Sequence, residues 1–424
     1  MITINIDKTV EDKFKGIYQE GRFSDSCSTG DTKTSLVQKF QKKIVNHLSI
    51  PNPQNAQLIV MRFLQVHFGN DPNDVSEDKI TAYLLRKDLK TIIHSFWECV
   101  SLVWSEKLTN EGALPMPSDK YADALSAWEM TKDVALCENI KATRIAMVKQ
   151  IITPETLPFF EGISGNDLSS TAKQGTVLTN KDYLKKVKLR FASELYAEET
   201  GALAILKGLF DYGLLDGAPR HEVLIAMDIP VCPYCNRQYI TSFADDGLDK
   251  TTADLDHYYC QSLYPYLALS LYNFVPSCQI CNSRFKLAKD FYHIPHLYPY
   301  EKQSSSAVTF TLGDVTLLLD DATSENAILD IICSGEAAAN SVSTFHLNEV
   351  YQSHRDYVRE LVWKTKIYNE DLISTLQDEF DSLFSSSQDV RQLIFGQYLD
   401  ATDIHKRPLA KLTQDLLTDL GYTE

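Results

Sequence analysis

The first half of the chain carries apolar residues at the spacing of amphipathic helices. One stripe with a period near that of a helix turn comprises Leu58, Ile59, Phe63 and Val66. A second stripe comprises Tyr183, Leu184, Val187 and Phe191. These patterns predict that residues 1–225 form a mostly helical N-terminal region.

After residue 300 the pattern changes to short runs rich in β-formers. Three such runs are Ala307–Leu312, Val315–Leu319 and Ile328–Ile332. Helical spacing then returns, with one apolar face made of Leu347, Val350, Tyr351, Val358, Leu361 and Val362. We therefore expect residues 301–424 to form a C-terminal region of short strands followed by helices.

Between these regions, residues 226–300 contain two C-x-x-C pairs, Cys232–Cys235 and Cys278–Cys281. Each pair can direct two thiolates to one point, and four thiolates make a closed tetrahedral zinc site. The pairs are further apart than the roughly 15–20 residues of a simple zinc ribbon, so the zinc would staple the base of a larger insert. The alternatives to a zinc site are that the cysteines form disulfides or that one pair is a redox C-x-x-C motif. Residues 1–7 do not resemble a signal peptide, so we expect a cytoplasmic protein, where disulfides are rare.

The insert also places polar residues in an informative order. Asp256-His257 is followed by Asn273, which precedes an apolar-Pro-Ser-Cys run, and Asn282 directly follows Cys281. Over residues 230–300 this order resembles the HNH endonucleases of the ββα-metal fold, in the subtype braced by four cysteines. The resemblance implies a compact ββα-metal nuclease domain with a structural zinc.

The resemblance also implies roles for these residues. His257 would be the general base, since an imidazole titrates near neutral pH. Asp256 and the side-chain oxygen of Asn282 would hold Mg²⁺ or Mn²⁺, a hard cation that stabilises the charge of the reacting phosphate. Asn273 would bridge the loop and orient His257. Asp256 and His257 are adjacent, so they face opposite sides of a strand unless the chain bends there.

Neighbouring residues complete the candidate site. Arg284, Lys286 and Lys289 lie beside the proposed cation, and we expect them to contact nucleic-acid phosphates. Many relatives carry a proline where this chain has Cys260, which we expect to be a small buried residue rather than a fifth thiol at the metal. His293 and His296 follow in a turn. We expect both to face solvent, with metal or phosphate contact as the alternative.

Composition limits the functional classes. The chain has 57 acidic and 41 basic residues and a net charge of −16, which argues against a general nucleic-acid coat protein. We predict an α-rich α+β fold and a metal-dependent HNH endonuclease acting on double-stranded DNA. The layout looks like effector nucleases of bacterial anti-phage systems, of the Septu and retron-linked types, which pair with an ATPase subunit. The alternatives are an RNA-cleaving (tRNA) toxin and a zinc-braced binding or scaffold module with an inactive site.

Overall fold

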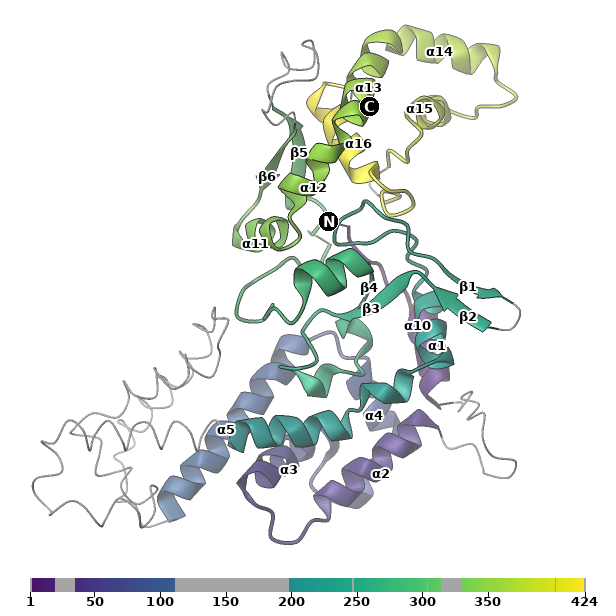
Figure 1. Cartoon of the computed structure of the whole chain (residues 1–424). Coiled ribbons are helices and arrows are strands. Elements are labelled where there is room, and N and C mark those ends of the chain that lie inside the picture. Colours follow the sequence, from purple (N-terminus) through teal and green to yellow (C-terminus); the bar gives the residue numbers. More distant parts are fainter. Residues whose placement is uncertain are drawn as a thin grey trace, which may run out of the picture.

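The computed structural model describes residues 2–19, 35–110, 198–245, 248–302, 304–313, 329–400 and 402–422 (Figure 1). Within these ranges helices predominate and the strands pair only in small two-stranded antiparallel sheets, so the chain has an α-rich α+β fold. The predicted helical stripe of residues 183–191 and the predicted strand of residues 315–319 lie outside the described residues.

The N-terminal region is helical, as its periodicity predicts. Its helices are α1 (Lys8–Gln19), α2 (Leu36–Leu48), α3 (Asn55–Phe68), α4 (Glu77–Leu84) and α5 (Leu89–Asn110), followed by a helical stretch at 198–209 and by α10 (Ala218–Met227). Ser35 begins α2 with a capping box, in which its hydroxyl accepts from the amide of Gln38. Helix α3 buries Ile59 and Phe63, but Val66 is 63% exposed, so the predicted stripe ends before it.

The central insert is built on a pair of short hairpins. Strand β1 (Ser242–Asp245) pairs with β2 (Leu248–Thr251), and β3 (Ala253–His257) pairs with β4 (Phe274–Cys278). The β3–β4 register places His257 opposite Phe274 and Ala253 opposite Cys278. A π-helical turn, Cys281–Lys286, follows β4. The insert therefore presents two paired strands and then a helical turn.

The first strands of the C-terminal region form a third antiparallel pair. Strands β5 (Val308–Leu312) and β6 (Leu329–Cys333) coincide with the first and third predicted runs and pair with each other. The helices that follow are α11 (Glu336–Thr344), α12 (Leu347–Tyr351), α13 (Arg355–Ile367), α14 (Glu370–Glu379), α15 (Ser387–Phe395) and α16 (Ala410–Asp419). The predicted apolar face is buried except at Val350, which is half-buried. In Figure 1, α14 and α15 lie at the end of the molecule opposite α2 and α3.

All three regions contribute to one hydrophobic core. The segment before α1 also reaches the insert, because the amide of Ile2 donates to the carbonyl of Pro233 at 2.9 Å. The buried Asn236 joins the insert to the C-terminal region. Its side-chain amide group donates to the carbonyls of Ile404 and Arg407 at 3.2 and 3.4 Å. Its side-chain oxygen accepts from the amide of Lys411 at 3.0 Å.

Replacing Asn236 should loosen this attachment. Asn236 has a φ of 49°, a left-handed conformation that alanine adopts at a cost, and its loss would leave the amide of Lys411 without its acceptor. We expect Asn236→Ala to lower the free energy of unfolding by about 2–4 kcal/mol. Urea denaturation measures this change.

Asn52→Ala is the matched control. Asn52 has nearly the same backbone angle, a φ of 50°, but its side chain is exposed. This variant should lose only the backbone preference, about 1 kcal/mol. Equal losses in the two variants would show that the side-chain hydrogen bonds of Asn236 contribute nothing.

Candidate metal centre and the adjoining polar cluster

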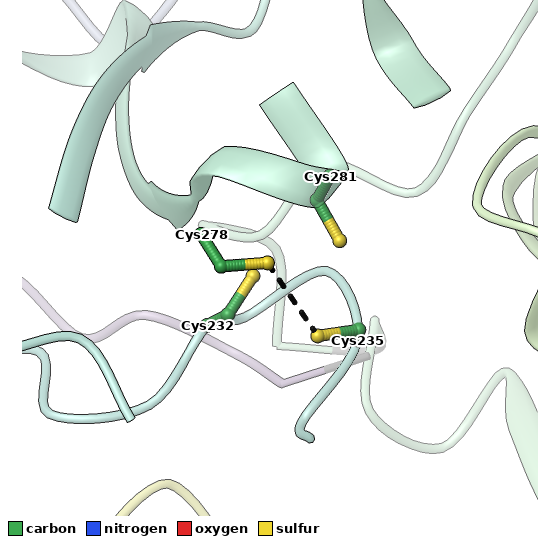
Figure 2. Close-up of side chains that lie close together, drawn as sticks. All are labelled: Cys232, Cys235, Cys278 and Cys281. Atoms are coloured by element: carbon green, nitrogen blue, oxygen red, sulfur yellow. Dashed lines mark hydrogen bonds between the residues drawn. The ribbon is translucent and has the colours of Figure 1, made fainter. Parts of the chain in front are cut away.

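Four cysteine side chains lie close together in the insert (Figure 2). Their sulfur atoms all lie within 4.8 Å of one another, and all four residues are buried: Cys232, Cys235, Cys278 and Cys281. The Sγ atoms of Cys235 and Cys278 are 4.0 Å apart. A tetrahedral zinc with Zn–S bonds near 2.3 Å separates its sulfurs by roughly 3.8 Å. The four residues predicted from the sequence can therefore hold a metal ion such as zinc in an all-thiolate shell.

Local structure explains the convergence of the sulfurs. In the first knuckle the amide of Asn236 donates to the carbonyl of Cys232 at 2.8 Å, and the left-handed Asn236 turns the chain after Cys235. In the second knuckle, Cys278 ends β4 and Cys281 begins the π-helical turn. The hydroxyl of Tyr351 on α12 donates to the carbonyl of Cys235 at 2.6 Å, which joins the first knuckle to the C-terminal helices.

His257 ends β3 and is held by one hydrogen bond. Its Nε2 lies 2.9 Å from the carbonyl oxygen of Ala268, which can only accept, so Nε2 carries the proton and Nδ1 carries the lone pair. The ring packs edge-on against Tyr212 and Phe274, with centroids 4.6 and 5.3 Å away. Burial lowers the pKa of His257 below its usual 6.5, and the Ala268 hydrogen bond only partly opposes this effect. His257 is thus a neutral, oriented imidazole at neutral pH.

Asn273 braces the loop that carries Ala268. Its side-chain oxygen accepts from the amide of Tyr259 at 2.8 Å. Its amide group donates to the carbonyls of Tyr259 and Leu267 at 3.1 and 3.2 Å. The side chain is fully buried and uses its oxygen and both amide hydrogens in these bonds. Asn273 therefore holds Leu267, the residue next to the Ala268 whose carbonyl orients His257, and none of these three hydrogen bonds is to the imidazole.

Asp256 points to the other side of β3, as expected for a neighbour of His257 on a strand. One carboxylate oxygen accepts from the hydroxyl of Tyr234 at 2.6 Å and the other from the ammonium of Lys286 at 3.0 Å. The ammonium also donates to the carbonyl of His257 at 2.6 Å and lies over the ring of Phe291. The Lys286 and Asp256 side chains are 1% and 5% exposed. Lys286 is therefore a buried ion-pair partner, not the surface phosphate contact that we expected.

Asn282 has a different partner from Asp256. Its amide group donates to a carboxylate oxygen of Asp254 at 3.0 Å, and the hydroxyl of Ser283 donates to the same oxygen at 3.4 Å. Asp254 was not among the site residues predicted from the sequence. The available signal was its position two residues before Asp256, which puts both carboxylates on one face of β3.

A catalytic cation shared by Asp256 and Asn282 does not fit this arrangement. Both carboxylate oxygens of Asp256 already accept hydrogen bonds, one of them from an ammonium that would repel a second cation. In the described part of the chain, the four cysteines are the one group of three or more His, Cys, Asp or Glu side chains placed to hold a metal. The zinc site is supported, and the Mg²⁺ or Mn²⁺ site is not formed in this conformation.

Of the other residues predicted near the site, the two basic residues are exposed and the cysteine is buried. Arg284 and Lys289 are exposed, in keeping with a role at the surface. Cys260 is buried and stands outside the metal-binding group, as expected.

His296 is buried and the side chain of His293 is 2% exposed, which corrects the expectation that both face solvent. His293 Nδ1 lies 2.6 Å from a carboxylate oxygen of Asp290. His296 stacks on Phe291, and its Nε2 lies 2.9 Å from the hydroxyl of Thr344. Burial lowers the pKa of His296 to about 4.

Comparisons of the chain with models of protein families, with curated proteins and with solved structures find no match. No helix in the described ranges is both long enough and apolar enough to cross a membrane.

We predict that the purified protein carries one zinc ion per chain. Cys232→Ser should lower the zinc content and the melting temperature, because structural zinc contributes about 10–16 kcal/mol of apparent binding energy in small domains. Elemental analysis and thermal denaturation measure the two effects. Cys260→Ser is the control, since Cys260 is also a buried thiol of the insert but not part of the cluster. Absence of zinc from the wild type, or equal behaviour of the two variants, would contradict the assignment.

Proposed function

We propose that the chain is an HNH endonuclease that hydrolyses phosphodiester bonds, with double-stranded DNA as its substrate. The observation that carries the proposal is the state of His257. It ends the first strand of the β3–β4 pair, and Ala268 anchors it through Nε2, so Nδ1 holds the lone pair. Nδ1 has no hydrogen-bond partner among the described residues. An imidazole in this state suits the deprotonation of a water molecule.

The surrounding residues support this role. Neutral His257 would accept a proton from the attacking water, and Asn273 would keep Ala268 in place as charge develops on the ring. In this class of nuclease a divalent cation stabilises the charge on the phosphate and the leaving oxygen. Because Lys286 holds Asp256 in this conformation, we assign no step to such a cation.

Substrate contact is proposed for the exposed Arg284 and Lys289, which lie on and just after the π-helical turn. Two basic residues are a small patch on a chain with a net charge of −16, which repels nucleic acid at long range. We therefore propose that a protein partner, such as an ATPase subunit, delivers or presents the substrate. Co-purification from the native host tests this, and a monomer that cleaves fully without any partner would argue against it.

His257→Ala should abolish cleavage and leave the zinc content and the fold unchanged. A positioned general base contributes about 10²- to 10⁴-fold to the rate, so we expect a loss of that size. The assay compares cleavage of plasmid DNA and of total RNA with Mg²⁺, Mn²⁺ or EDTA. Cys260→Ala is the control in the same insert and should remain active.

The outcomes separate the candidate functions. Equal activity of the two variants would remove His257 from the mechanism. Cleavage of RNA alone would favour the tRNA-toxin alternative, and no cleavage under any condition would favour a zinc-braced binding module.

The pH dependence of cleavage should also report on His257. Burial lowers the pKa of His257 from 6.5, so the neutral base remains available in mildly acidic solution and is lost only at lower pH. We expect a pH–rate profile that is flat above pH 6.5 and declines below it as the ring becomes protonated. An acidic limb centred above pH 6.5 would contradict the assignment of His257 as a buried neutral base.

A further inference from the structure

The turn that follows β4 has an unusual backbone. Residues Cys281–Lys286 form a π-helix, a rare geometry that often marks functional sites. It ends at Leu287, a non-glycine residue with φ 52° and ψ −134°. Conformations of this kind cost about 1–3 kcal/mol and persist only where the surrounding structure holds them. The Leu287 side chain is 60% exposed, so its own packing contributes little to holding it there.

The contacts of Lys286, the residue before Leu287, offset the cost of this backbone conformation. Its ammonium bonds to a carboxylate oxygen of Asp256 and to the carbonyl of His257, and both charged side chains are almost fully buried. The other donor to Asp256, the hydroxyl of Tyr234, is neutral, so loss of the ammonium would leave the buried carboxylate without a compensating positive charge. The strained turn is therefore coupled to the charge balance of Asp256.

We propose that Lys286 is an internal cation that closes the Asp256 site, and that a divalent metal ion must displace it to bind there. This inference rests on the proposed nuclease function, because it concerns the cation which that function requires. A divalent ion and the ammonium both seek the carboxylate oxygens of Asp256, and their charges repel each other. Withdrawal of Lys286 would relax Leu287 and would also move Asn282, which lies on the same turn.

The direct test is metal binding. Mn²⁺ is titrated into the zinc-loaded protein, and the free ion is followed by electron paramagnetic resonance. Lys286→Gln should bind Mn²⁺ roughly 10- to 100-fold more tightly than the wild type, because the competing charge is gone and Asp256 has lost its ion-pair partner. Lys289→Gln, which removes the same charge three residues away, should leave the affinity within about twofold. Adding Asp256→Asn to Lys286→Gln should abolish the gain.

Leu287→Gly tests the same competition between Lys286 and the metal ion, but here Mn²⁺ binding is expected to weaken. Glycine adopts the angles of Leu287 with little strain, so this variant should stabilise the closed turn and weaken Mn²⁺ binding by about three- to tenfold. Ala288→Gly is its control, since Ala288 is also exposed but is not among the residues with positive φ. This comparison decides the matter if Lys286→Gln fails to fold.

The results distinguish this inference from the proposed function. If Mn²⁺ affinity is the same in the wild type, Lys286→Gln and Leu287→Gly, Lys286 does not compete with metal, and the inference is overturned even if the wild type cleaves DNA. If the affinities shift as expected but no variant cleaves nucleic acid, the competition stands and the nuclease proposal fails.

Discussion

The meeting of four thiols is the constraint on which the central part of this protein depends. Cys232 and Cys235 lie before the paired strands of the insert, Cys278 ends the last of these strands, and Cys281 begins the turn that follows it. A metal bound by all four would fix both ends of the insert and so limit where β3 and the π-helical turn can lie. Ile2 and Tyr351 contact this part of the insert from outside it, and Asn236 of the insert bonds to Ile404 of the C-terminal region.

Successive side chains of β3 point to opposite faces of the strand, so the neighbours His257 and Asp256 lie in different chemical environments. His257 faces Tyr212, Phe274 and a carbonyl, which favours a neutral ring. Asp256, its neighbour, accepts hydrogen bonds from the hydroxyl of Tyr234 and the ammonium of Lys286. Lys286 also donates a hydrogen bond to the backbone carbonyl of His257. A change in the Lys286–Asp256 ion pair would therefore alter the contacts of the residue that carries the imidazole.

The sequence was sufficient where the relevant geometry is local. A C-x-x-C turn fixes the directions of its own thiols, and apolar spacing identified the buried face of α12 and α13 as well as β5 and β6. The sequence did not predict burial correctly where contacts between segments far apart in the chain determine it. Val66 lies on the predicted stripe of α3 but is exposed, and His296 is buried where its ring meets Thr344 of α11. The inward direction of Lys286 depends on a π-helical turn, for which no spacing rule was available.

The distance along the chain between the two knuckles has a consequence for synthesis. Ribosomes add roughly 5–20 residues per second, so Cys232 and Cys235 emerge several seconds before Cys278 and Cys281. During that interval the nascent chain offers only two thiols, which can hold a metal ion weakly or be oxidised to each other. Strand β3 is likewise made before β4 and has no partner until the second knuckle appears. Zinc supply and thiol redox state during translation should therefore govern how much of the chain reaches its native state.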